Sequence, residues 1–377
     1  MSAVVLAVHS IDTEGPLGGN ARRLPDGSPE FMDNWEDILT SLRELTAQEF
    51  RHAHADSFGG PYRFNWFVMD FTGFRTNPKC RVAEYHDTWD HIASLPVRCD
   101  GLYWHYHVPP ADGVGDRWSE SWLSSNECNT VLVRRLLERR AFPAAFRAGG
   151  TIEDEPASRW LEQTIPIDYS NRASERSHPG ADLYHFNWYG APQAWGSYHP
   201  ALGDPMREGR MRRFVYRCTD LRSRYNELTY EQVEACFLEA KAANRPRVLS
   251  YFSHDNRDMR PETYHVAELL ARAARNTGVP WASCTAVDAH QRMQQMTAQP
   301  IDLSIEPDAG GYLIRASRAP FQSIPFVGAR LRDGRFVRLY PTPLGSMAWR
   351  MAVVRDEIEQ LGAAVTSVAG DVALAFA

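Results

Sequence analysis

The sequence lacks the features that mark membrane-spanning, secreted and disulfide-stabilised proteins. No apolar stretch approaches the roughly 20 residues that a membrane helix needs, so we expect no membrane-spanning segment. The apolar run at residues 3–8 is short and no basic segment precedes it, so we expect no secretory signal and a cytoplasmic protein. The six cysteines lie singly along the chain, without a C-x-x-C pair. That spacing argues against a structural zinc site and against a disulfide framework.

An excess of positive charge is also missing. The 41 lysine and arginine residues are outnumbered by 47 aspartate and glutamate residues, and the formal net charge is −6. This balance provides no general attraction for nucleic acids or acidic membrane surfaces, so we expect neither as a partner. With 44% hydrophobic and 23% charged residues, the composition is that of a globular protein and not of a disordered chain. The sequence leaves the oligomeric state open.

Short apolar runs alternate with helical patterns through residues 1–298. About seven strands that alternate with helices favour a parallel α/β barrel over a β-sandwich. After residue 298, short strand-like runs separated by turn residues predict a small β-rich accessory domain at residues 299–377. Strands are predicted at 3–8, 62–69, 101–105, 144–146, 165–167, 214–216, 248–252 and 281–284, and helices at 34–48, 129–139, 230–243, 262–276 and from Thr285 onward.

Two pairs of side chains follow predicted strands of the barrel. Asp12 and Glu14 come after the first strand, and His105 and His107 come at the end of a later one. Residues two apart on an extended chain point to the same side. Alone, an Asp-x-Glu is usually a solvated turn or a helix cap, and a His-x-His is as often structural as functional. Together they lie at the end of the barrel where active sites occur, and they suit a catalytic divalent metal with open coordination positions.

Three more polar residues follow strands at that same end. Arg147 precedes two glycines, which allow the backbone to approach closely, and Asp168 and His254 follow two further strands. Each of these residues alone is more often a surface or structural residue than a catalytic one. Their shared position at one rim supports the hypothesis of a metal-dependent hydrolase.

Residues 3–297 resemble the NodB-homology polysaccharide deacetylases, which are metal-dependent carbohydrate esterases built on a distorted α/β barrel. The resemblance implies that Asp12 is the general base and that Glu14 binds the metal together with His105 and His107. In that family the acidic residues are adjacent and the histidines are four apart, whereas here both pairs are two apart. Two alternatives therefore stay open: Asp12 rather than Glu14 binds the metal, or one histidine lies outside the ligand set.

The same resemblance assigns three supporting roles. Arg147 orients the general base, Asp168 matches the aspartate of the fourth motif, and His254 is the general acid. From the chemistry of carboxylates near imidazoles, we expect Asp168 to keep His254 protonated and Arg147 to keep Asp12 ionised.

The expected reaction is hydrolysis of a non-peptide C–N bond, with N-deacetylation of an amino-sugar glycoside or a small acylated metabolite as the first choice. Zinc is the first metal to test, and cobalt, nickel and iron also suit a site of two histidines and one carboxylate. Aromatic residues can stack on sugar rings or simply pack the structure, and the candidates for substrate binding are Trp104, Tyr106, Trp188 and Trp195. The competing hypothesis is a non-catalytic protein that binds carbohydrate or a partner on a degenerate deacetylase barrel.

Overall fold

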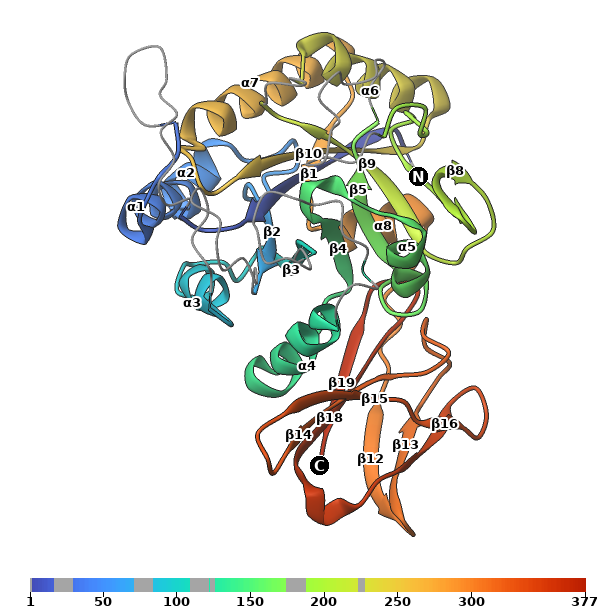
Figure 1. Ribbon diagram of the computed structural model, residues 1–377. Coiled ribbons are helices and arrows are strands. Elements are labelled where there is room, and N and C mark those ends of the chain that lie inside the picture. Colours follow the sequence, from blue (N-terminus) through green and yellow to red (C-terminus); the bar gives the residue numbers. More distant parts are fainter. Residues whose placement is uncertain are drawn as a thin grey trace.

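The computed structural model describes residues 2–16, 30–70, 84–108, 122, 126–173, 188–222 and 228–377. Seven parallel strands form a closed barrel, because each strand pairs with the next and the last, β10, pairs again with β1 (Figure 1). This confirms the predicted parallel barrel of about seven strands. In order around the barrel, the strands are β1 (Val4–Thr13), β2 (Phe64–Met69), β3 (Gly101–Tyr106), β4 (Ala145–Ala148), β5 (Ile167–Asn171), β9 (Phe214–Asp220) and β10 (Pro246–His254).

Helices connect the strands and cover the barrel. Four of the described helices begin at a polar side-chain cap. For example, the Asn34 side chain accepts a hydrogen bond from Asp37 N, and Thr285, which was predicted to start a helix, accepts one from Asp288 N. None of the described helices is both long enough and apolar enough to cross a membrane. The described helices are α1 (Trp35–Thr46), α2 (Gln48–Ala53), α3 (Asp87–Ala93), α4 (Glu127–Arg139), α5 (Glu155–Glu162), α6 (Tyr230–Ala243), α7 (Arg260–Thr277) and α8 (Ala286–Gln294), with short 3₁₀ turns at Gly149–Thr151 and Arg355–Glu357.

The first strand is longer than predicted. We expected it to end before His9, where the sequence becomes polar, but β1 continues to Thr13 and all ten of its residues are buried. The polar residues are accommodated because they find partners inside the protein. The ring of His9, for example, contacts Tyr62 Oη and Ser253 Oγ at 3.0 Å each. The extension places Asp12 within the strand, where its direction is fixed by the sheet.

Alternate residues of the strands face the barrel interior. The interior cluster includes Leu6, Val8, Phe67, Tyr169 and Phe252, which come from strands around the whole barrel. By the same alternation, Asp12, His105, Arg147 and His254 share this inward direction at the carboxyl ends of their strands. The fold therefore brings these four side chains to one end of the barrel.

Residues after α8 form two four-stranded antiparallel sheets, which confirms the predicted β-rich C-terminal part. In Figure 1, α4 lies between these sheets and the barrel. Two glycines allow the close approach, because a Cβ at Gly328 would lie 2.9 Å from Val133 and one at Gly362 would lie 3.0 Å from Leu137. The sheets consist of β12 (Leu303–Asp308), β13 (Gly311–Ala316), β17 (Ala348–Ala352) and β16 (Thr342–Pro343), and of β15 (Phe336–Leu339), β14 (Phe326–Leu331), β18 (Ile358–Thr366) and β19 (Val372–Phe376).

Four further strands of the described part of the chain lie beside the barrel. One of them, the predicted strand at residues 281–284, is observed next to β1, and another runs antiparallel to β9, whereas the remaining two form a separate hairpin. They are β11 (Trp281–Ser283), β6 (Ser197–Tyr198), β7 (Pro200–Ala201) and β8 (Asp204–Glu208).

Candidate metal centre

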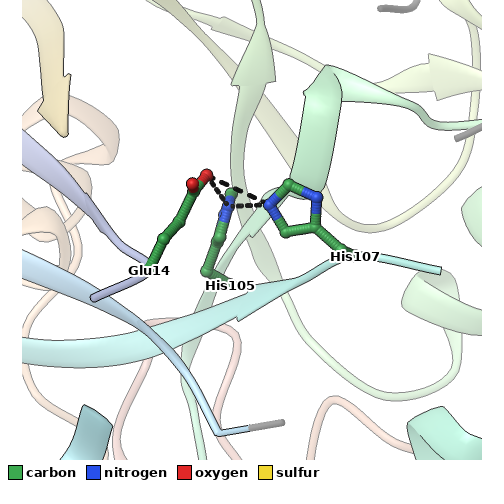
Figure 2. Close-up of side chains that lie close together, drawn as sticks. All are labelled: Glu14, His105 and His107. Atoms are coloured by element: carbon green, nitrogen blue, oxygen red, sulfur yellow. Dashed lines mark hydrogen bonds and ion pairs between the residues drawn. The ribbon is translucent and has the colours of Figure 1, made fainter. Parts of the chain in front are cut away.

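Three side chains with metal-binding atoms meet at the carboxyl end of the barrel (Figure 2). Glu14 Oε1 lies 3.2 Å from His107 Nε2 and 3.6 Å from His105 Nε2, and the two Nε2 atoms are 2.9 Å apart. A point about 2 Å from all three atoms exists, which matches the usual lengths of zinc–nitrogen and zinc–oxygen bonds. The donor set of two imidazoles and one carboxylate fits a divalent metal that keeps open positions for water or substrate.

The hydrogen bonding of His105 favours metal binding. Its Nδ1 atom lies 2.9 Å from the carbonyl oxygen of Arg147. A carbonyl can only accept a hydrogen bond, so Nδ1 carries the proton and donates it. In the neutral ring, Nε2 then has a free lone pair, and this atom faces Glu14 and His107. Metal-binding histidines are commonly oriented in this way by a backbone carbonyl.

The ring of His107 packs against the backbone of Gly149, at the start of the turn after β4. A Cβ at Gly149 would lie 2.4–2.7 Å from three atoms of that ring. No side chain fits at such a distance, so glycine is required if His107 is to keep its position. In the Gly-Gly segment after Arg147, Gly149 therefore provides the space that the ring of His107 occupies.

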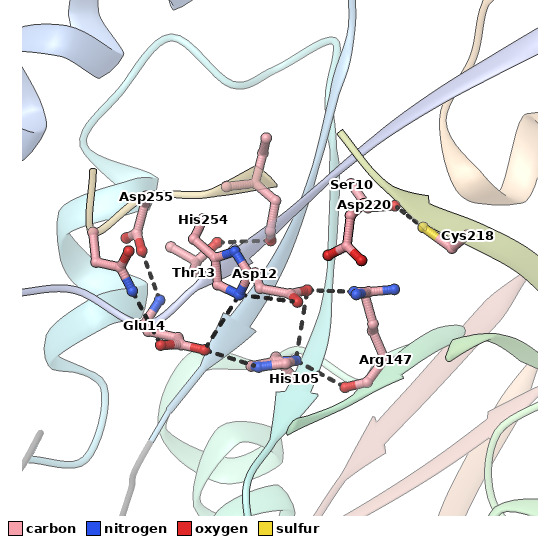
Figure 3. Close-up of polar contacts among 12 residues, drawn as sticks. Ser10, Asp12, Thr13, Glu14, His105, Arg147, Cys218, Asp220, His254 and Asp255 are labelled. Atoms are coloured by element: carbon pink, nitrogen blue, oxygen red, sulfur yellow. Dashed lines mark hydrogen bonds and ion pairs between the residues drawn. The ribbon is translucent and has the colours of Figure 1, made fainter. Parts of the chain in front are cut away.

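Asp12 lies beside the three candidate ligands but is not part of that group. Its Oδ1 accepts a hydrogen bond from Arg147 Nε at 2.6 Å, and its Oδ2 lies 3.8 Å from His254 Nε2 (Figure 3). Burial raises the pKa of Asp12, but Arg147, His105 and His254 lower it by more, so the pKa lies below its ordinary value. Asp12 is therefore ionised at neutral pH and is available as a proton acceptor.

His254 is the most accessible of these groups, with 28% of its side chain exposed. It is the last residue of β10 and the register partner of Asp12 on β1. Its Nε2 lies 4.0 Å from Glu14 Oε1. Burial lowers the pKa of His254 below 6.5, although Glu14 and Asp12 offset part of this effect. The imidazole is therefore neutral at pH 7 before it takes up a proton.

Asp168 does not lie at this centre. Its neighbours Ile167 and Tyr169 face the barrel interior, so Asp168 points outward from β5. Its Oδ2 accepts a hydrogen bond from Arg213 Nη1 at 2.5 Å, and no contact between Asp168 and His254 occurs among the described residues. The expectation that Asp168 keeps His254 protonated is therefore wrong in this structure.

The two aromatic residues that flank the histidines also point away from the centre. Because side chains alternate along β3, Trp104 and Tyr106 occupy the face opposite His105 and lie in a core cluster with Trp122 and Phe146. Trp104 is fully buried and Tyr106 is 3% exposed. Of the two alternatives for these residues, core packing is the observed one, and neither presents a ring for a substrate.

Trp188 and Trp195 are buried as well. Trp188 is 1% exposed, and its indole N–H donates a hydrogen bond to Thr151 O at 2.8 Å. Trp195 is 3% exposed, and the guanidinium of Arg217 lies 4.2 Å from the centre of one of its rings. Their expected role in substrate stacking is not supported, because each ring is used in packing. Tyr184 and Phe186, the aromatic residues shortly before Trp188, lie outside the described residues.

Three of the described polar residues at this rim were not predicted from the sequence. Asp255 and Asn256 contact Glu14 and its loop, and Asp220, at the end of β9, pairs with Arg172 at 2.5 Å. Asp220 ends a buried strand, as the predicted site residues do, so its position alone could have identified it. The contacts of Asp255 and Asn256 depend on the closure of the barrel between β10 and β1, which the sequence does not display.

The arrangement unites three metal-binding donors, an ionised carboxylate and a partly exposed imidazole at one end of a barrel. This set of groups can hold a divalent cation and move protons beside it. No protein-family model matches the chain, and no curated protein matches it.

Proposed function

We propose that the protein is a metal-dependent hydrolase that cleaves a non-peptide C–N bond. The observation that carries this proposal is the convergence of Glu14, His105 and His107 on one point, beside an ionised Asp12 that takes no part in the triad. A purely structural metal site is usually closed by four protein ligands, whereas three ligands leave room for chemistry.

Glu14, His105 and His107 would hold the metal. A bound divalent cation would lower the pKa of a coordinated water from 15.7 towards about 7 and polarise a carbonyl oxygen. Zinc is the first cation to test, and cobalt, nickel and iron suit the same donors. The proposal that Glu14, and not Asp12, is the carboxylate ligand follows from the 2.6 Å hydrogen bond that ties Asp12 to Arg147.

The remaining residues would transfer a proton from the water to the leaving nitrogen. Asp12 accepts a proton from the attacking water, and Arg147 keeps the carboxylate ionised until then. His254 Nε2 lies 3.8 Å from Asp12 Oδ2, so it is placed to take up the proton from Asp12. His254 then donates the proton to the leaving nitrogen. The water oxygen joins the acyl carbon as the C–N bond breaks, and the products are a carboxylic acid and an amine.

N-deacetylation of an amino-sugar glycoside or of a small acylated metabolite is the reaction that we propose within this class. The resemblance to NodB-homology deacetylases supports it, since the residues to which that resemblance assigns the roles of base, metal ligands, arginine and acid lie near one another: Asp12, Glu14, His105, His107, Arg147 and His254. The expected stacking residues Trp104, Tyr106, Trp188 and Trp195 are buried in packing, so the acylated nitrogen, and not a long polymer, is the feature that we expect the site to recognise.

The proposal is tested by incubating the metal-loaded protein with a panel of N-acetylated and N-formylated amino sugars and measuring released acetate and formate. We expect release that falls 10²–10⁴-fold in Asp12→Asn, which is the usual contribution of a general base. Release that is unchanged in Asp12→Asn would contradict the mechanism. Tight sugar binding by a protein that takes up no metal would favour the carbohydrate-binding alternative.

A further inference from the structure

The carboxylate of Glu14 is oriented by contacts on both of its oxygens. Oε1 faces His105 and His107, whereas Oε2 lies 3.2 Å from Nδ2 of Asn256. Glu14 follows the last residue of β1, so the barrel's hydrogen bonds do not fix its position. Other residues must therefore hold it in place.

The segment after β10 provides those contacts. Asp255 Oδ1 accepts hydrogen bonds from the backbone N–H groups of Glu14 at 2.8 Å and of Gly15 at 3.1 Å. Figure 3 shows Asp255 next to Glu14, on the same segment as His254. Asp255 thus holds the backbone of Glu14, and Asn256 holds its side chain.

The amide of Asn256 has only one sensible orientation. A carboxylate accepts hydrogen bonds and cannot donate them, so the NH₂ group must face Glu14. Asn256 Oδ1 is then buried without a hydrogen-bond partner among the described residues. An unpaired buried acceptor is unfavourable. Asn256 is only 2% exposed, so the contact of its NH₂ group with Glu14 is made at the expense of an unpaired oxygen.

We propose that Asn256 is a positioning residue for the metal centre, which holds Glu14 in the rotamer that presents Oε1 to the metal. This inference rests on the proposed function, because it requires that Glu14 binds a metal. Without the amide, the glutamate side chain regains rotamers that turn Oε1 away from the histidines. Loss of such a supporting contact typically weakens metal affinity 10–100-fold.

The test compares zinc affinity of the full-length wild type, Asn256→Ala and Asn256→Asp, measured by competition with a chromophoric chelator. We expect the dissociation constant to rise 10–100-fold in Asn256→Ala. Asn256→Asp has nearly the same shape, but it places an acceptor opposite Glu14 Oε2, so we expect at least as large a rise. The Asp variant also keeps the test valid if the Ala variant fails to fold.

Asn171→Ala is the matched control. Asn171 is also buried near the end of a barrel strand and also uses its side-chain amide, which donates to Pro192 O at 2.9 Å. We expect its zinc affinity to equal that of the wild type, whatever its melting temperature without metal. Equal losses in Asn171→Ala and Asn256→Ala would overturn the inference, because the effect would be one of general stability.

The outcome separates this inference from the proposed function. A wild type that binds no zinc, cobalt, nickel or iron would overturn the proposed function and this inference with it. A wild type that binds zinc with the same affinity as both Asn256 variants would overturn the inference alone and leave the metal centre standing.

Discussion

Two buried arginines form ion pairs on the barrel, one on its inner surface and one on its outer surface. The groups that surround the two pairs differ. Arg147 is bonded to Asp12 inside the barrel, and Asp12 in turn neighbours His254, which is partly exposed. Arg213 is bonded to Asp168 and Glu153 outside the barrel strands, and all three side chains are at most 1% exposed. Only the first pair connects to groups that a substrate can reach.

The electrostatics of the two clusters also differ. One carboxylate faces Arg147, and its pKa is lowered below the usual value despite burial. Two carboxylates share Arg213, and burial together with Asp168 raises the pKa of Glu153 well above its usual value. The first arrangement favours the ionised form of Asp12, whereas the second favours the protonated form of Glu153, whose side chain is fully buried. A buried arginine–carboxylate pair is therefore not by itself evidence of a catalytic site. It must also lie on the side of the strand that faces the candidate centre.

The largest expected difference is between Asp12→Asn and Asp168→Asn. The first variant removes the proposed base and should lower product release 10²–10⁴-fold while zinc binding persists. The second should keep both activity and zinc binding, because Asp168 points away from the centre and Arg213 retains Glu153. Steady-state rates and metal content of the two variants check this. An equal loss of activity in Asp168→Asn would abolish the distinction between the clusters.

The two arginines should be equally important for stability and unequally important for catalysis. Arg147→Met and Arg213→Met each leave a buried carboxylate without its partner, which typically costs about 3–5 kcal/mol. Urea unfolding should show a loss of that size in both variants.

Because the pKa of Asp12 is lowered in the folded protein, the stabilisation that its ionised form contributes is present at neutral pH and is lost as the pH falls below 3.8.

The pH dependence of activity should then separate the same two variants. Without Arg147, burial raises the pKa of Asp12, so the base becomes protonated at a higher pH and the acidic limb of the pH–rate profile moves upward. Arg213→Met should leave this limb in place. Profiles that shift together, or not at all, would show that Arg147 does not control the ionisation of Asp12.

A smaller effect is expected from Gly149→Ala. The added methyl group would overlap the ring of His107 and displace it, so zinc affinity should fall about 10–100-fold, as for other supporting contacts of metal ligands. Gly345→Ala is the control, because a Cβ there would have no neighbour within 4 Å. Chelator competition on both variants measures the difference, and an unchanged affinity in Gly149→Ala would argue against His107 as a ligand.

The barrel and the inner-face residues could be predicted from the sequence because their signals are local. Valine-rich runs mark the strands, and His-x-His indicates two candidate metal ligands on one side of the chain at the end of β3. The end of β1 was misplaced because the polar residues from His9 onward are buried and hydrogen-bonded, which hydropathy does not reveal. Three of the four residues assigned to catalysis lie around the triad.

The face of Asp168 and of the flanking aromatic residues could not be predicted. Strands in a parallel barrel are buried on both sides, so polar and apolar residues do not alternate in a way that identifies the interior. In β5, every residue from Ile167 to Asn171 is buried. Deciding that Asp168 points outward to Arg213, and that Trp104 points outward to Trp122 and Trp160, required knowledge of which elements cover the outside of each strand.

The most direct test of the account is the metal content of the protein by elemental analysis after reconstitution, for the wild type, Glu14→Ala, His107→Ala and Asp168→Asn. We predict near-stoichiometric metal in the wild type and in Asp168→Asn, and loss of metal in Glu14→Ala and His107→Ala. A wild type without metal, or metal that remains in both ligand variants, would contradict the claim that Glu14, His105 and His107 form a metal centre.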